Sequence, residues 1–180
     1  MNMYCGSNKT AIASQTQISN AMTALLKKKK YEDISISLLC KEANISRQTF
    51  YSLFNEKDNV IVFELQKCYF DTKETVKSPK DEKPFSEFCH GFAHYLVNNK
   101  DYFKLLWENN ILYLIYESVY DVFMSCCKKS CLYMNNVTAG GLTGIARSYC
   151  EEGYTASTEE LETYMSRLLV HYECEPLKKK

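Results

Sequence analysis

Two short helical segments separated by a tight turn place the strongest constraint on how this chain folds. Ser35 or Ser37 can cap a first short helix, because serine side chains accept hydrogen bonds from free backbone amides at helix starts. Asn44-Ile45 predicts a turn, since asparagine tolerates the left-handed conformation that ends helices. Ser46 can then cap a second short helix over residues 47–53. Two such helices joined by about four residues are typical of a helix-turn-helix.

Helical periodicity extends over most of the remaining chain. Apolar residues recur at helical spacing from about residue 9 to residue 29, and again from about 56 to 76. We expect Asn55 to cap the second of these helices, with Asp58 completing a capping box. Only 3 prolines and 6 glycines interrupt 180 residues, and no segment predicts a strand. The fold class expected is therefore all-α, with about nine helices.

The second half of the chain predicts a polar linker followed by five helices. The linker covers residues 78–84, and Pro84 suits the first turn of the helix that follows. An aromatic helix then holds residues 102–107, and a longer one covers roughly 111–134. Asn135-Asn136 predicts a turn before a helix over about 137–152, which Gly153 closes. Ser157 or Thr158 opens the last helix.

The charge distribution is asymmetric although the net charge is zero. Residues 1–57 carry eight Lys or Arg and four Asp or Glu, a net charge of +4. Residues 58–177 carry eleven and eighteen, a net charge of −7, and Lys178–Lys180 add +3. A basic N-terminal segment on an acidic remainder suits a head that approaches phosphates while the rest stays away from the nucleic acid.

Side chains that suit DNA recognition lie on the second short helix. Its first turns can reach base edges in the major groove, where arginine pairs with guanine and glutamine with adenine. Tyr51 and Ser52 are expected towards the backbone, and Lys57 beside a phosphate at the next helix start. The predicted DNA-binding residues are Ser46, Arg47, Gln48, Thr49, Tyr51, Ser52 and Lys57.

Over residues 34–58, ISISLLCKEANISRQTFYSLFNEKD, the chain resembles the TetR family of bacterial transcriptional regulators. The features that carry the resemblance are the alanine in the turn, the apolar-Ser step, the Thr-Phe-Tyr triplet, and the Phe and Lys that follow. A later segment, Ala139-Gly140-Gly141-Leu142, is similar to a low-molecular-weight subgroup that includes regulators of dihydroxyacetone kinase operons. The chain departs from the family pattern at Asn44, often glycine, and at Gln48, often glycine or a small residue.

The resemblance implies a ligand-responsive repressor that binds a palindromic double-stranded DNA operator. Its parts would be a helix-turn-helix head over residues 1–57 and a dimerisation and effector-binding domain over 58–180. The last two helices, about 137–152 and 158–172, would pair in a homodimer. An aromatic or otherwise apolar effector would alter the separation of the two heads. Residues that can line its pocket are Tyr95, Tyr102, Phe103, Trp107, Tyr113 and Tyr116.

The main alternative is a coactivator of the same fold that acts through a partner protein rather than through strong DNA binding of its own. An enzyme is not expected, because the chain has no phosphate loop, nucleophile elbow or supported catalytic triad. No cofactor is expected either. The N-terminus has no secretory pattern and the apolar runs are too short for a membrane span, so a cytoplasmic location is expected.

The cysteines and histidines are expected to be ordinary structural residues. Nine cysteines without a Cys-x-x-Cys pair indicate reduced and mostly buried thiols. A redox sensor at Cys126 or Cys127, which cluster with Cys131, is the alternative interpretation. His90 and His94 share a helical face at a spacing of four, but no zincin pattern accompanies them. No metal site is therefore expected.

Overall fold

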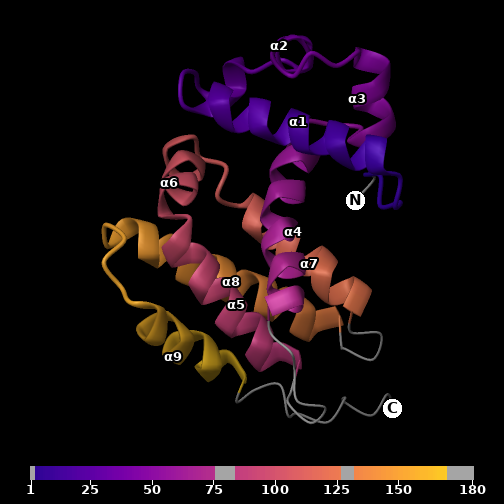
Figure 1. Cartoon of the computed structure of the whole chain (residues 1–180). Helices are drawn as coiled ribbons and strands as arrows, with labels where there is room; N and C mark the ends of the chain where they lie inside the picture. The colour runs from indigo at the N-terminus through magenta and orange to yellow at the C-terminus, as the bar shows by residue number, and fades with distance from the viewer. Residues whose placement is uncertain (1–2, 76–83, 127–131, 170–180) are drawn as a thin grey trace.

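The computed structural model describes residues 3–75, 84–126 and 132–169, and these residues form nine α-helices and one 3-10 helix without any strand (Figure 1). The prediction of an all-α fold is confirmed. The elements, in chain order, are α1 (Lys9–Leu26), η1 (Tyr31–Asp33), α2 (Ile36–Glu42), α3 (Arg47–Leu53), α4 (Asp58–Thr75), α5 (Pro84–Asn98), α6 (Lys100–Glu108), α7 (Leu114–Cys126), α8 (Leu132–Glu151) and α9 (Thr158–Leu169).

Helices α1, α2 and α3 form a small three-helix head at one end of the molecule (Figure 1). Ile18 and Met22 of α1 are buried at helical spacing and form the head's core with Leu39 of α2 and Phe50 of α3. Phe54 extends this core towards α4, with its ring centroid 5.9 Å from that of Phe50. Packing of these apolar faces leaves the outer sides of α2 and α3 to solvent.

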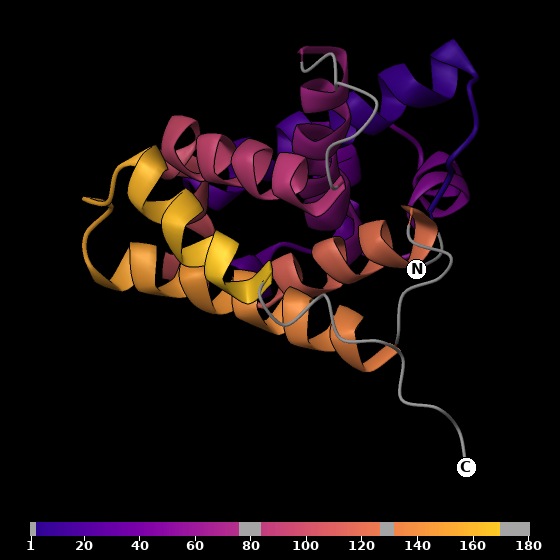
Figure 2. The same cartoon turned by 90° about the horizontal axis from the view of Figure 1, so that it is seen from below.

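Helix α4 connects the head to a larger helical body. It packs against α1 in the head, and against α5 and α7 in the body. In the body α7 packs on α8, and α9 packs on both α5 and α8; Figure 2 shows α9 lying between those two helices. The body core includes Phe92, Phe103 and Leu142, all fully buried.

Several helix ends follow the sequence signals. The Ser35 side chain accepts a hydrogen bond from the amide of Leu38, and therefore caps α2. Ser157 caps α9 reciprocally: its hydroxyl accepts from the Glu160 amide, and its own amide donates to the Glu160 carboxylate. Gly153, with φ of 74°, follows α8 in the left-handed conformation that glycine adopts without strain.

Two predicted boundaries are wrong. Asn55 does not cap α4; it adopts a φ of 58°, and the helix begins later, at Asp58. Asn135-Asn136 is not a turn but part of α8, and the predicted helix over 111–134 is replaced by α7 and the start of α8. Asn136 is accommodated there because its amide donates to the Leu132 carbonyl one turn earlier, at 2.7 Å. Most of the predicted polar linker, up to residue 83, lies outside the described residues.

Candidate nucleic-acid interface

The start of α3 is held by its cap. Asn44, with φ of 52°, turns the chain after α2, as the sequence predicts. The Ser46 hydroxyl accepts a hydrogen bond from the amide of Thr49 at 3.0 Å and lies 2.8 Å from the Thr49 hydroxyl. These contacts fix the first turn of α3, which is the turn that reaches base edges in a helix-turn-helix.

Helix α3 separates an apolar side from a polar side. Phe50 and Leu53 are buried in the head, whereas Arg47, Gln48 and Ser52 are exposed. Tyr51 is a large aromatic residue that is 45% exposed on the same outer side. An exposed arginine, glutamine and tyrosine on one short helix provide donors, acceptors and an aromatic edge to a ligand.

Arg47 and Tyr51 are paired across one turn of α3. The guanidinium donates to the Tyr51 hydroxyl at 3.5 Å, and its carbon lies 5.9 Å from the ring centroid. The hydrogen bond to Tyr51 raises the pKa of Arg47 above its usual value. The contact orients an otherwise flexible side chain and leaves most guanidinium donors available to a ligand.

Lys57 has a structural role that the sequence pattern does not predict. Its ammonium donates to the carbonyl of Tyr31 at 2.8 Å and to that of Ile34 at 3.2 Å, and lies 4.0 Å from the Tyr31 ring centroid. Two of its three donors are therefore engaged in holding η1 against the start of α4. A phosphate contact by Lys57 stays a prediction, and the same ammonium would have to bind the phosphate and the two carbonyls together.

The head meets the body through a polar joint around Tyr31. The Tyr31 hydroxyl donates to the Asp58 carboxylate, which also accepts from the Tyr113 hydroxyl at 3.1 Å. The Tyr31 amide donates to the Asn109 side chain at 2.8 Å, and Lys30 donates to the Glu108 carbonyl. Burial, and then the hydrogen bond to Asp58, raise the pKa of the Tyr31 phenol. The joint therefore ties η1 to α4, α6 and the segment before α7.

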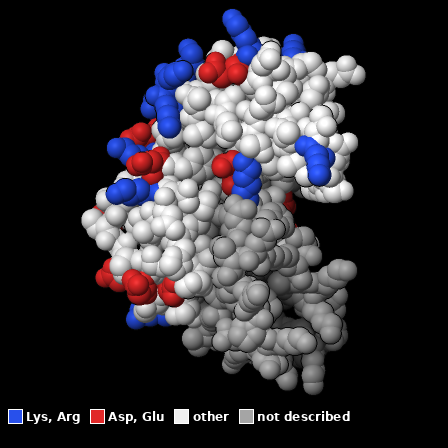
Figure 3. All heavy atoms as spheres, viewed as in Figure 1, with Lys and Arg blue, Asp and Glu red and all other residues white. Residues whose placement is uncertain are grey.

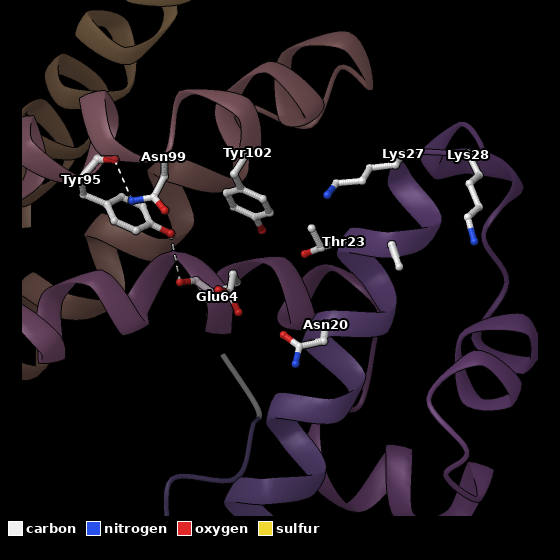
Figure 4. A pocket seen from close by; sticks show the side chains of 9 residues that line it. Asn20, Thr23, Lys27, Lys28, Glu64, Tyr95, Asn99 and Tyr102 are labelled. Atoms are coloured by element: carbon white, nitrogen blue, oxygen red, sulfur yellow. Dashed lines mark hydrogen bonds between the residues drawn. The ribbon is translucent and has the colours of Figure 1, made fainter.

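A cleft of about 410 Å³ opens between α1 and the helices α4, α5 and α6 (Figure 4). Two of the six predicted pocket residues, Tyr95 and Tyr102, line it. Figure 4 shows Lys27, which follows α1, facing Tyr102, while the Tyr95 hydroxyl donates to the Glu64 carbonyl of α4 at 3.4 Å. The remaining lining residues are Asn20, Thr23, Ala24, Lys28, Glu64 and Asn99.

The other four predicted pocket residues lie outside this cleft. Phe103 is fully buried in the body core, where its ring packs edge-on against Tyr95. Trp107 lies under the guanidinium of Arg147, and the Tyr116 hydroxyl donates to Asn136. Tyr113 belongs to the polar joint. The described cleft therefore brings together Tyr95 and Tyr102, and a pocket that also holds the other four stays a prediction.

The cysteines that the structure describes include three buried thiols and one exposed thiol. Cys40, Cys89 and Cys150 are buried, and Cys5 is exposed. Burial raises the pKa of the Cys89 thiol to about 12, and burial also raises that of Cys150. Cys127 and Cys131 lie outside the described residues, as does the side chain of Cys126.

His90 and His94 lie side by side on α5, with ring centroids 4.4 Å apart. The structure places Glu162 of α9 against them, with one carboxylate oxygen 2.7 Å from His90 Nδ1 and 3.9 Å from His94 Nε2. The helical spacing predicts the histidine pair but gives no signal for Glu162. No periodic signal relates α5 to α9, because only tertiary packing brings these helices together.

Charge is distributed unevenly over the face shown in Figure 3. Lys and Arg side chains gather over the upper part of this view, where the head lies, and Asp and Glu are prominent on the lower part of the described surface. Lys27, Lys28, Lys29 and Lys30 at the end of α1 are all exposed. The head therefore carries the positive side chains that attraction to phosphate requires.

Helix α8 carries an apolar surface that the described residues leave uncovered. Tyr133 is 78% exposed and Val137 is 57% exposed. A Cβ added at Gly140 or Gly144 would meet nothing within 4 Å, whereas one at Gly141 would meet Leu168 of α9 at 2.9 Å. Gly141 thus allows α9 to pack on α8, while the other two glycines face away from the rest of the described chain.

In the part of the chain that the structure describes, no helix is long and apolar enough to cross a membrane.

Comparison with solved structures shows that the fold is that of TetR-like regulators. The Listeria innocua protein Lin0861 superimposes with a TM-score of 0.70 at 16% identity, over 94% of this chain and 96% of that one. A TetR transcriptional regulator from Streptococcus agalactiae gives a TM-score of 0.51 at 18% identity, over 89% of this chain and 96% of that one. The predicted resemblance to this fold is confirmed.

One curated relative matches this chain in sequence. The chain is 26% identical over 107 residues to the HTH-type dhaKLM operon transcriptional activator DhaS of Lactococcus lactis. This match covers 59% of the chain and 44% of the relative, so the chain aligns with less than half of that protein's length. No protein-family model matches the chain.

Proposed function

Given this TetR-like fold, we propose that the chain is a sequence-specific, DNA-binding transcriptional regulator that reads DNA with α3. The observation that carries the proposal is the outer side of α3, where Arg47, Gln48 and Tyr51 are exposed while Phe50 fixes the helix in the head. Arginine and glutamine are the side chains that recognise guanine and adenine in the major groove. Ser46, Thr49, Ser52 and Lys57 complete the proposed interface.

The proposed functional unit is a homodimer formed through α8 and α9. The support is the exposed apolar surface of α8, with Tyr133 and Val137, together with Gly140 and Gly144, which permit close approach of another helix. A two-fold axis there would present two copies of α3 to successive major grooves, about 34 Å apart, and would require a palindromic operator. The head then corresponds to residues 1–57 and the dimerisation domain to 58–180.

We place the proposed effector in the cleft between α1 and the helices α4, α5 and α6. An occupant would touch α1 of the head and α5 and α6 of the body together, so it can change their relative position and the spacing of the two heads. The lining combines the Lys27 ammonium, the Glu64 carboxylate and the Asn20 and Asn99 amides with two tyrosines. This chemistry suits a polar small molecule with hydrogen-bonding groups, rather than the apolar effector expected from the aromatic residues alone.

The proposed output is repression that the effector relieves. The curated relative is named an activator, and a reporter fused to the chain's own promoter separates the two outputs. Deletion of the regulator raises expression from that promoter if the chain represses, and lowers it if the chain activates. We propose no catalytic role for the chain, and the proposed location is the cytoplasm.

Footprinting on DNA that flanks the chain's own gene tests whether the exposed side of α3 contacts the operator. Wild-type protein is expected to protect one short palindrome. The double substitution Arg47→Ala, Tyr51→Ala is expected to abolish protection, whereas Lys104→Ala, which removes an exposed positive charge of α6, is expected to retain it. Protection that survives the double substitution would exclude α3 as the reading helix. Absence of any wild-type footprint would favour the coactivator, and a partner pull-down would follow.

A further inference from the structure

We propose that His90, His94 and Glu162 form a binding site for a divalent transition-metal ion, with Zn²⁺ as the reference ion. One ligand atom from each of the three side chains lies within 4.8 Å of the other two. The inference does not depend on DNA binding, since the site lies on the body, between α5 and α9.

The local geometry favours convergence of the three donors. His90 and His94 lie one turn apart on α5, so their rings project from the same side of the helix. Zinc binds imidazole nitrogen and carboxylate oxygen at about 2.0–2.2 Å, which puts neighbouring donors roughly 3–3.5 Å apart. The Glu162 oxygen is already 2.7 Å from one histidine nitrogen and 3.9 Å from the other. Small side-chain rotations are enough to bring all three to an ion.

The packing of α5 on α9 holds the donors in place. The Cys89 and Phe92 side chains, adjacent to the histidines on α5, are buried, as are Leu161 and Met165 beside Glu162 on α9. The backbone positions of the donors are therefore fixed by core residues on both helices. The donors themselves are accessible, with side-chain exposures of 51% for His90, 48% for His94 and 34% for Glu162.

The donor set determines which ions fit. Two imidazoles and one carboxylate suit Zn²⁺, Co²⁺, Ni²⁺ or Cu²⁺, whereas Mg²⁺ and Ca²⁺ prefer all-oxygen sites. Three protein ligands leave one position of a tetrahedral ion open to water. The side chains of both histidines are about half exposed, so an ion bound there would exchange with solvent. A bound ion would also tie α9 to α5.

Titration of the purified full chain with Co²⁺ and Zn²⁺ tests the site. Co²⁺ is expected to give the visible absorption of a four-coordinate ion with nitrogen and oxygen ligands, at one ion per chain, and Zn²⁺ is expected to displace it. His90→Ala, His94→Ala and Glu162→Gln are each expected to weaken binding at least about tenfold. Glu152→Gln, which removes an exposed carboxylate near the end of α8, is the matched control and is expected to bind like wild type.

Thermal unfolding with and without metal provides a second measurement that does not depend on the variants' intrinsic stability. Zn²⁺ is expected to raise the Tm of wild type and of Glu152→Gln, and to leave the Tm values of the three site variants unchanged. Mg²⁺ is expected to change the Tm of none of these proteins. Cobalt–thiolate charge-transfer absorption, wild-type affinity in His94→Ala, or no binding at all would overturn the proposal. In the last case the cluster is only a His–Glu hydrogen bond.

Discussion

Arg47 and Tyr51 act as a pair at the scale of single residues. The hydrogen bond and the ring contact between them orient the guanidinium on the solvent side of α3. An oriented guanidinium loses less conformational freedom when it binds a base edge. The identity of the arginine therefore matters as much as its charge.

Substitution Arg47→Lys tests whether this residue reads a base or only a phosphate. Lysine keeps the charge but cannot form the planar, bidentate contact. We expect affinity for the operator to fall by about 1–3 kcal/mol while affinity for unrelated DNA changes little. Competition anisotropy measures both quantities. An equal loss on both DNAs would assign Arg47 to the phosphate backbone.

Thiol reactivity provides a second prediction at this scale. Burial raises the pKa values of the Cys40 and Cys150 thiols, so the reactive thiolate is scarcer at mildly alkaline pH than for an exposed cysteine. Mass spectrometry after brief alkylation of native protein should find Cys5 modified before these two. Modification of all three at the same rate would contradict the packing around α2 and α8. Unfolding in denaturant should remove the difference and serves as the control.

At the scale of elements, the polar joint around Tyr31 links the head to the body. Asp58 is partly buried at the start of α4 and accepts hydrogen bonds from Tyr31 and Tyr113, while Lys57 binds two carbonyls of η1 and its flank. These contacts join η1, at the edge of the head, to α4, α6 and the segment before α7. Movement of the head relative to the body must therefore alter them.

Substitution Tyr31→Phe removes the central hydrogen bond of the joint. We expect the free energy of unfolding to fall by about 1.5 kcal/mol, because the bond is partly buried and its acceptor is charged. Tyr113→Phe removes the second donor to the same carboxylate, and should cost about 0.5 kcal/mol or less because Tyr113 is 52% exposed. Urea denaturation measures both. Equal losses of unfolding free energy in the two variants would show that the Tyr31 hydrogen bond stabilises the protein no more than the Tyr113 hydrogen bond.

The same phenol predicts a pH dependence. Its folded-state pKa is raised above the usual value of 10.0, so its contribution to stability is complete below pH 10 and declines as the pH rises further. Wild-type protein should therefore lose more stability than Tyr31→Phe between pH 9 and about pH 11. Parallel losses in the two proteins would contradict the assignment.

The sequence predicted the elements whose ends are set locally, and failed where tertiary contacts decide. Ser46 caps α3 as expected, and at α2 and α9 the first of the two expected serine or threonine residues, Ser35 and Ser157, is the cap, because a cap depends on neighbours within three residues. Asn135 and Asn136 read as a turn but lie inside α8, where one is buried against Met124 and the other bonds Tyr116. Similarly, Glu162 joins the histidine pair only through the packing of α9 on α5.

At the scale of the whole molecule, the exposed side of α8 determines the proposed assembly. Gly144 faces away from the described chain and Gly141 faces α9, although they are one turn apart. Substitutions at Gly144 and Gly141 can therefore distinguish an effect on dimer formation from an effect on the folding of each chain.

Substitution Gly144→Leu is expected to convert the dimer to a monomer without unfolding it. A side chain there meets nothing in the described chain, and leucine gains up to about 1 kcal/mol of helix propensity over glycine. Gly141→Leu is the control, and should destabilise each chain because its side chain collides with Leu168. Analytical ultracentrifugation and thermal unfolding distinguish the cases. A stable dimer in Gly144→Leu would remove α8 from the interface.

The most direct test of the central claim is the ratio of affinities for the chain's own palindromic operator and for a scrambled duplex, measured at physiological salt. A sequence-specific regulator is expected to bind the operator at least about 10³-fold more tightly, and substitution of Arg47 should reduce that ratio. A ratio near one, with binding that disappears as salt rises, would contradict sequence-specific recognition by α3.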